Sequence, residues 1–288
     1  MQIQTNHYRE LLRTFRAHRK LEGYRDVTHT GAKQLLSYLE QLGIHTLAQV
    51  RTGHIKGVYA HLHERANAYG GTLSLHTIRG YLDDMRALLR WAERTEQISI
   101  SPMAALRFPA PPMNERPILS KVEIKRLYST CVLPIERLTL SLFYGCGLRA
   151  SEGGALNIAD VNAQSGLLYV RSGKGGKRRV VPMAPSVIKD IETYINEQRP
   201  SQISRHTKVA DRCALTLNKI GTRMQGDSYR LVFKALLAQC EDIRQDVSLH
   251  SLRHSIATHL LAGGMRIERV RDFLGHSCLE STQIYTRV

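Results

Sequence analysis

The sequence contains little from which a membrane segment or a disulfide framework could be built. It has no run of about 18 apolar residues, which a membrane-spanning helix needs, and its first ten residues, MQIQTNHYRE, lack the apolar core of a secretory signal. The five cysteines, at positions 131, 146, 213, 240 and 278, are scattered and include no CxxC pair. This pattern argues against a disulfide framework and a zinc ribbon. We therefore expect a cytoplasmic protein.

Acidic residues are also scarce relative to basic ones. Against 41 Lys and Arg there are 25 Asp and Glu, so the net charge is +16 and the isoelectric point is near 9.9. Such an excess indicates a polyanionic partner, and without a membrane segment the favoured partner is nucleic acid. The 288 residues are 42% hydrophobic, which is ordinary for a globular protein and enough for about two domains.

Residues 1–106 are predicted to form a four-helix bundle. The fourth helix has the clearest stripe, with apolar residues at steps of four and three: Ile78, Leu82, Met85, Leu89 and Ala92. The third is predicted to follow Thr52 and to end at Gly70 and Gly71. Arginines and histidines on the polar faces could meet phosphate groups, or could form an ordinary solvated basic face.

A proline-rich linker is predicted at residues 107–117, where RFPAPPMNERP contains four prolines. Residues 118–288 then form a second, mainly helical domain with a small antiparallel sheet. Its clearest strand signal is at 167–183, LLYVRSGKGGKRRVVPM, where two β-rich arms surround a glycine-rich turn. The predicted fold class is therefore mainly α, with a helical bundle followed by a mixed α/β domain.

Two basic clusters in the second domain stand out. Arg149, in GCGLRASE at 145–152, follows a glycine-permitted turn that would fix the direction of its guanidinium. The alternative is a surface arginine paired with Glu152, which is worth a few tenths of a kcal/mol. Lys174 lies at the tip of the predicted hairpin, where it is suited to reaching a DNA groove. That loop is not GxxxxGK[ST] and does not lead into a helix, which disfavours a nucleotide cradle; a solvated basic turn is the alternative.

A histidine-rich helix is predicted from HSLRHSIATH at 250–259. His250 and Arg253 would share one face of it, so both could address one phosphate. The spacing of His250 and His254 also suggests a metal site, but no carboxylate lies between them and no further ligand cluster accompanies them. We therefore predict neither a metal nor a cofactor.

Two further candidates, His276 and Tyr285, lie near the end of the sequence. Taken singly, the histidine would be a helix cap and the tyrosine a packing residue. Together with two arginines, a lysine and a histidine they make the set of groups expected around a transferring phosphoryl group. A cluster of cations favours the phenolate form of tyrosine, which can act as a covalent nucleophile. A phosphotyrosyl ester would conserve the energy of the broken DNA bond, so resealing would need no ATP.

These motifs resemble those of the tyrosine recombinases, also called the phage integrase family, in the layout of its short Xer-like members. The resemblance rests on four segments in the same order: GLRASE at 147–152, SGKGGKRRVVP at 172–182, HSLRHSIATHLLAGG at 250–264 and LGHSCLESTQIYTRV at 274–288. It spans essentially the whole second domain, which it implies is the catalytic domain. The first domain fits the family's DNA core-binding domain only by its position and helical character.

The resemblance implies how the phosphate would be held. Arg149 and Arg253 are expected to clamp the scissile phosphate. His250 is expected to contact that phosphate and to take part in proton transfer. Glu152 matches the acidic residue that supports the site structurally.

The resemblance also implies how the strand would be cut, without metal or ATP. Lys174 is expected to protonate the leaving 5′ oxygen. His276 is expected to bind the phosphate and to help seat the nucleophile. Tyr285 is expected to be that nucleophile and to form a 3′-phosphotyrosyl bond.

The implied reaction is strand exchange between two double-stranded DNA core sites through a Holliday junction. It would be carried out by a homotetramer or by a heterotetramer with a related recombinase. It would serve integration, excision or inversion, as in mobile elements, or dimer resolution. Two alternatives stay open: a non-cleaving DNA-binding protein of the same fold and a type IB topoisomerase.

The sequence departs from the family pattern in two places. Gly153 and Gly154 follow Glu152, and each costs a helix about 1 kcal/mol relative to alanine, so we expect a short or mobile helix there. Only three residues follow Tyr285, fewer than in members that pack a C-terminal segment onto a neighbouring protomer. We therefore expect that the chain is truncated or that another surface couples the protomers. No extra amino-terminal arm-binding domain is evident, so we expect a simple recombinase of short core sites.

Overall fold

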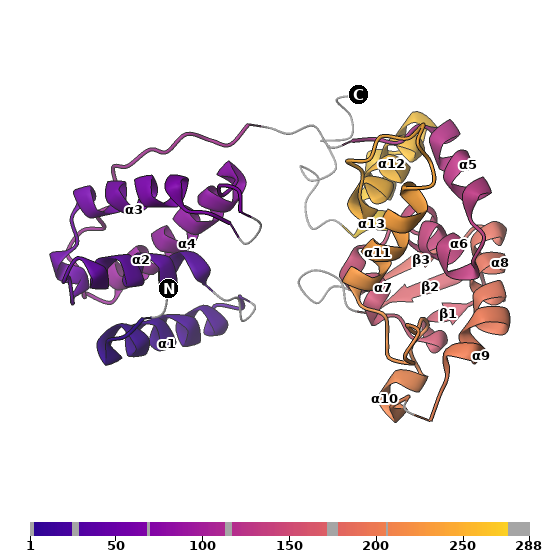
Figure 1. The fold of residues 1–288 in the computed structure, drawn as a ribbon, viewed down its shortest axis with the longest axis horizontal. Coiled ribbons are helices and arrows are strands. Elements are labelled where there is room, and N and C mark those ends of the chain that lie inside the picture. The colour runs from indigo at the N-terminus through magenta and orange to yellow at the C-terminus, as the bar shows by residue number, and fades with distance from the viewer. Residues whose placement is uncertain are drawn as a thin grey trace. The chain divides into compact units, whose positions relative to one another are not determined.

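A computed structural model describes residues 3–24, 29–67, 70–112, 117–171, 178–205 and 207–275. The chain divides into two compact units, Met1–Asn114 and Glu115–Val288 (Figure 1). The predicted fold class is confirmed, because the first unit is helical and the second combines helices with a small antiparallel sheet.

The described residues of the first unit form four α-helices and one short 3₁₀ turn: α1 (Asn6–Leu21), α2 (Thr30–Gln41), η1 (Leu47–Gln49), α3 (Thr52–Glu64) and α4 (Leu75–Arg94). The apolar stripe predicted for the fourth helix is buried in α4, which packs against α2. The two helices approach so closely that a Cβ added at Gly31 would collide with the backbone carbonyl of Tyr81. The Ser74 hydroxyl caps the start of α4 by accepting a bond from the Thr77 amide at 3.2 Å.

The prediction for the end of the third helix was wrong. Helix α3 ends at Glu64, before the Gly70 and Gly71 pair. The cause is Asn67, whose side-chain oxygen accepts a bond from the Gly71 amide and whose side-chain nitrogen donates to the Thr72 carbonyl. Asparagine favours such local turns over continued helix, so the chain turns back and pairs Ala66 with Thr72.

The second unit is built from helices around a small sheet. Its helices and helical turns are α5 (Lys121–Thr130), α6 (Pro134–Leu140), η2 (Ser141–Gly145), α7 (Ala150–Ala155), η3 (Ile158–Asp160), α8 (Pro185–Thr193), η5 (Tyr194–Gln198), α9 (Arg199–Gln202), α10 (Val209–Arg212), α11 (Gly226–Leu237), α12 (Leu249–Ala262) and α13 (Ile267–Leu274). Helix α13 lies against both α12 and strand β3 (Arg179–Pro182), and α11 packs on α6 and α7 (Figure 1).

The sheet contains the predicted hairpin arms and one strand that was not predicted. The arms are β2 (Leu167–Val170) and β3, which pair antiparallel with Leu168 opposite Val181 and Val170 opposite Arg179. The additional strand β1 (Val161–Asn162) pairs with β2 at the other edge, in the order β1-β2-β3. The tip of the hairpin, residues 172–177, is outside the described residues.

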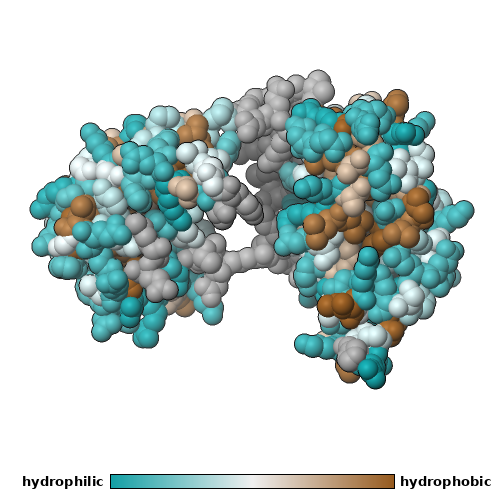
Figure 2. All heavy atoms as spheres, viewed as in Figure 1, coloured by the Kyte–Doolittle hydropathy of each residue, from teal (hydrophilic) through white to brown (hydrophobic). Residues whose placement is uncertain are grey.

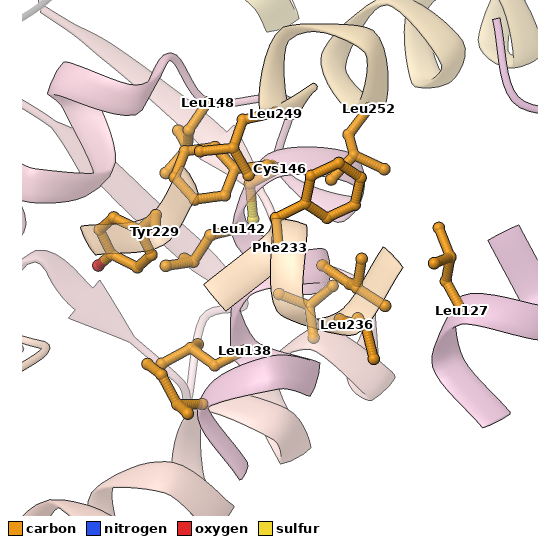
Figure 3. Packing of buried hydrophobic residues seen from close by; sticks show 14 of the residues in the cluster. Leu127, Leu138, Leu142, Cys146, Leu148, Tyr229, Phe233, Leu236, Leu249 and Leu252 are labelled. Atoms are coloured by element: carbon orange, nitrogen blue, oxygen red, sulfur yellow. The ribbon is translucent and has the colours of Figure 1, made fainter. Parts of the chain in front are cut away.

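The hydrophobic core of the second unit anchors the chain segments that carry Arg149 and His250. Leu148 and Leu249, each next to a predicted site residue, are buried in this core with Cys146, Leu142 and other residues (Figure 3). The backbones on either side of these two leucines are therefore anchored by apolar burial, which fixes where the neighbouring polar side chains begin.

The surfaces of both units are mainly hydrophilic in the view of Figure 2, where hydrophobic side chains form small separate patches. Among the described residues, no helix is long and apolar enough to cross a membrane.

Candidate active site

Arg149 is presented by a tight turn between η2 and α7. The five-residue π-helix η2 ends where the Cys146 amide donates to the Ser141 carbonyl at 2.9 Å. Gly147 then adopts φ +59°, which only glycine adopts without strain, and a Cβ there would lie 2.9 Å from the Phe273 ring. Arg149 is the N-cap residue of α7, which has only six residues, as its glycines predict.

The two glycines of α7 also allow close packing. A Cβ at Gly153 would lie 2.8 Å from the Phe143 ring, and a Cβ at Gly154 would lie 3.2 Å from the Met224 carbonyl oxygen. The loss of helix stability is therefore accompanied by a tight fit of α7 against the core. Glu152 directly precedes Gly153, so this fit also fixes the backbone from which the Glu152 side chain extends.

Glu152 is the centre of an arginine cluster. Its side chain is fully buried. Its Oε1 accepts bonds from Arg149 Nη1 at 2.7 Å and Arg179 Nη1 at 2.8 Å. Its Oε2 accepts bonds from the Arg149 backbone amide at 2.8 Å and Arg179 Nη2 at 2.9 Å, and lies 3.8 Å from Arg253 Nη1. One carboxylate thus organises three guanidinium groups.

This environment keeps Glu152 ionised. Burial alone would raise the pKa of its carboxyl group, but the hydrogen bonds and charge of Arg179, together with the bonds from Arg149, outweigh burial and lower the pKa from 4.5 to about 2. The group therefore stays a carboxylate, and the described cluster of three arginines and one glutamate carries an excess of positive charge. Such a cluster is suited to receiving an anion.

The same three arginines also bind the end of helix α13 through consecutive carbonyl oxygens. Arg179 Nε donates to the Phe273 carbonyl at 3.0 Å, Arg253 Nη2 to the Leu274 carbonyl at 2.6 Å, and Arg149 Nη2 to the Gly275 carbonyl at 3.2 Å. Carbonyls at a helix C-terminus lack helical partners and carry partial negative charge. The cluster therefore fixes the end of α13, directly before residue 276.

A pocket of about 430 Å³ opens beside this cluster. Arg149 and His250 lie on its wall, and Arg230 of α11 joins them. Its remaining lining comes from the turns that begin α7 and α12: Leu148, Ala150, Ser151, Ser248 and Leu249. The N-terminus of α12 faces the pocket and adds the positive end of a helix dipole. The pocket therefore combines cationic side chains with backbone groups that favour an anion.

The structure describes three of the six predicted site residues. Arg149 has 22% of its side chain exposed, and His250 is exposed on the same pocket. Arg253 has 1% of its side chain exposed and also donates to the Gly147 carbonyl. The expectation that His250 and Arg253 address one phosphate stays a prediction. The remaining three, Lys174, His276 and Tyr285, lie outside the described residues.

Two arginines of the site were missed by the sequence interpretation. Arg179 was included only in the basic hairpin, although it lies on the same face of β3 as the buried Val181. Side chains alternate between the two faces of a strand, so Arg179 shares the inward face with Val181. An arginine there needs a carboxylate partner, and this pattern could have identified Arg179 from the sequence. Arg230 lies on α11, and no spacing in the sequence connects it with Arg149.

Among the described residues, no group of three or more His, Cys, Asp or Glu side chains is arranged to hold a metal ion.

Comparison with known proteins decides the family. The model of the phage integrase family matches residues 117–288, which is more than half of the chain. The chain belongs to the phage integrase family of tyrosine recombinases. The resemblance found in the sequence motifs is thereby confirmed.

Relatives of similar length support this membership. The tyrosine recombinase XerC of Natranaerobius thermophilus is 32% identical over 256 residues, which cover 86% of this chain and 82% of that protein. The tyrosine recombinase XerA of Thermococcus kodakarensis is 32% identical over 255 residues, covering 83% and 86%.

Solved structures show the same fold. The Tn1549 transposon integrase in complex with a circular intermediate DNA matches with a TM-score of 0.74 and 18% identity, over 98% of this chain and 95% of that one. The XerH site-specific recombinase bound to its difH substrate matches with a TM-score of 0.66 and 18% identity, over 98% and 81%. The chain is therefore a Xer-like tyrosine recombinase in family and fold.

Proposed function

We propose that the pocket at the start of α12 receives the scissile phosphate of DNA and that this site-specific recombinase cleaves and rejoins strands there. The observation that carries the proposal is the Glu152 cluster, in which a buried carboxylate holds Arg149 at the pocket beside His250. Arg149 contacts the non-bridging phosphate oxygens, and Arg253 adds its charge from the buried side. Fixed cations aimed at the charge that develops during the reaction are an effective form of catalysis.

The covalent step uses the residues assigned by resemblance. The Tyr285 hydroxyl oxygen attacks the phosphorus, and the bond from phosphorus to the 5′ oxygen breaks. The tyrosine proton passes to His250, while the ammonium group of Lys174 gives a proton to the departing 5′ oxygen. His276 helps to seat the nucleophile. The products are a 3′-phosphotyrosyl ester and a free 5′ hydroxyl, so one ester replaces another.

Rejoining follows when a 5′ hydroxyl from the partner site attacks the phosphotyrosyl ester. Two such exchanges, separated by a Holliday junction, recombine two double-stranded core sites. The first unit binds the core site, and the assembly is a homotetramer or a heterotetramer with a related recombinase. The similarity to a transposon integrase supports a role in mobile-element movement, and dimer resolution is the alternative.

The test is the capture of the covalent intermediate. Wild type, Tyr285→Phe and the matched control Tyr169→Phe are incubated with nicked DNA fragments from the source genome in EDTA, and SDS-stable protein–DNA adducts are sequenced. Tyr169 lies on β2, away from the pocket. We expect adducts at one 3′ junction with wild type and the control, and none with Tyr285→Phe, whose DNA binding stays nearly unchanged.

Other outcomes distinguish the alternatives. Tight binding without adducts from wild type would support a non-cleaving DNA-binding protein. Relaxation of supercoiled DNA without dependence on sequence would support a type IB topoisomerase. Adducts that disappear when metal is removed would contradict a mechanism based on side-chain cations.

A further inference from the structure

Arg179 occupies a position that none of the assigned catalytic roles explains. It begins strand β3, and 9% of its side chain is exposed. Its two terminal nitrogens donate to both oxygens of Glu152 at 2.8 and 2.9 Å, which is the strong bidentate arrangement of arginine with a carboxylate. Its Nε donates to the Phe273 carbonyl at 3.0 Å. Arg179 thus joins three elements: β3, α7 and the end of α13.

Both arms of the hairpin are fixed by an arginine and a buried carboxylate. Arg171 follows β2 and pairs with Asp160 of η3, which also accepts a bond from the Asn157 amide at 2.9 Å. Arg179 begins β3 and pairs with Glu152. The two anchors differ in their surroundings, because Asp160 belongs to a local turn whereas Glu152 also holds Arg149. Of the described parts of the two arms, only β3 is connected directly to the arginine cluster.

Gly275 provides independent support for the tight fit around Arg179. Its φ is +64°, and a Cβ there would lie 2.8 Å from Cδ of Arg179. Any larger residue would therefore displace the arginine from Glu152 or move the end of α13. The guanidinium, the carboxylate and the helix end are packed as one unit.

We propose that Arg179 is a positioning residue: it fixes the start of β3, the described end of the arm that leads to Lys174, relative to the carboxylate that orients Arg149. Lys174 precedes Arg179 by five positions in sequence, so the start of β3 is the nearest described anchor for it on this arm. The proton transfer assigned to Lys174 by resemblance then depends on this anchor. A misplacement of about 1 Å can cost up to about a hundredfold in rate. The inference rests on the proposed strand-cleavage function.

Replacement of Arg179 should impair one step of the reaction, the protonation of the leaving 5′ oxygen. Loss of the β3 anchor displaces Lys174, so protonation of the 5′ oxygen becomes inefficient. Arg149 keeps Glu152 as its partner through its own side-chain and backbone bonds, so the phosphate contact is retained. The loss of cleavage rate should therefore depend on the leaving group. A general loss of structure would instead lower the rate equally for every leaving group.

The experiment compares two DNA substrates that carry the recombination site. One has the natural 5′ oxygen at the scissile phosphate, and the other has sulfur in its place. A thiolate is a far better leaving group than an alkoxide, because a thiol is much more acidic than an alcohol, and it departs without a proton donor. Single-turnover cleavage is measured at saturating protein for wild type, Arg179→Met and Arg179→Lys, with Lys174→Ala as the reference for a lost proton donor.

The neighbouring Arg178→Met serves as the matched control, because Arg178 is exposed and its loss removes the same charge from the same arm. We expect Arg179→Met to cleave the oxygen substrate about 10- to 100-fold more slowly than wild type. On the sulfur substrate the loss should shrink to about threefold or less, as for Lys174→Ala, since no proton is required. Arg178→Met should lower both rates by the same factor.

Arg179→Lys keeps a positive charge beside Glu152 but cannot form the two parallel bonds, so we expect the same dependence on the leaving group with a smaller defect. It also provides the test if Arg179→Met does not fold. An equal loss on both substrates, or no loss on either, would overturn the positioning role. Failure of wild type to cleave either substrate would instead refute the proposed strand-cleavage function.

Discussion

Replacement of Glu152 by glutamine tests the arginine cluster most directly. The substitution keeps the shape of the side chain and removes its charge. Since the pKa of Glu152 is lowered from 4.5 to about 2, the folded protein favours the carboxylate over the protonated form by about 3 kcal/mol, at about 1.4 kcal/mol per pKa unit. We expect Glu152→Gln to lose about this much free energy of unfolding at pH 7.

The loss should also depend on pH in a defined direction. A carboxyl group whose pKa is lowered by folding adds its full stabilisation above its ordinary pKa, and the stabilisation disappears as the pH falls toward the folded-state pKa. For Glu152 this window lies between 4.5 and about 2. At pH 3 the difference between wild type and Glu152→Gln should therefore have fallen to about two fifths of its value at pH 7.

The single tryptophan makes the assay specific. Trp91 lies in α4 of the first unit, so its fluorescence follows that unit, while circular dichroism also follows the helices of the second. For a domain of this size a loss of about 3 kcal/mol shifts the urea midpoint by about 1.5 M. We expect that shift in the second-unit transition alone, and no shift for the control Glu192→Gln, an exposed glutamate on α8. A loss that stays constant between pH 7 and pH 3, or one below about 0.5 kcal/mol, would refute the assigned charge network.

Three further substitutions test the packing of the two units and the charge of the pocket. Gly153→Ala should lower the free energy of unfolding of the second unit by about 1–3 kcal/mol, because the new Cβ would lie 2.8 Å from the Phe143 ring. Gly80→Ala, in the middle of α4 with open space around it, should raise the stability of the first unit by up to about 1 kcal/mol in the same urea experiment. Arg230→Ala should reduce the slope of log affinity against log salt by about 0.9, the value for one lost phosphate contact, whereas the exposed Arg212→Ala outside the pocket should leave it unchanged.

Helices with a regular apolar stripe were predictable because their burial depends on local spacing. In α4 all the residues predicted at steps of four and three are buried, together with Leu88 and Trp91. The end of α3 was not predictable from the glycine pair, because the turn is made by hydrogen bonds of the Asn67 side chain. Strand β1 was missed because two residues are too few to show alternation.

For the candidate site, the sequence identified residues within motifs, but it did not show which residues from distant parts of the chain contact one another. The motifs identified Arg149, His250 and Arg253 through the resemblance, and the short helix after Arg149 followed from its glycines. The partnership of Arg179 with Glu152 joins positions 27 apart in sequence, and it exists only once β3 and α7 are packed together. An arginine on the inward face of a strand predicts a carboxylate partner, but the strand pattern does not identify which carboxylate it is.

The three arginines differ in side-chain exposure, so they would contribute to anion binding in different ways. Arg149 has 22% of its side chain exposed and lies on the pocket wall, whereas Arg179 and Arg253 have 9% and 1% exposed. Under the proposed function an incoming phosphate therefore meets Arg149 first, while the two buried guanidinium groups act on it mainly through their charge and by holding the end of α13. Burying cations beside a single carboxylate is costly unless other acceptors join them, and the consecutive carbonyls of residues 273–275 are such acceptors. Carbonyl dipoles satisfy hydrogen bonds without cancelling net charge, so the cluster stays folded and keeps its excess of positive charge, as the proposed phosphate binding requires.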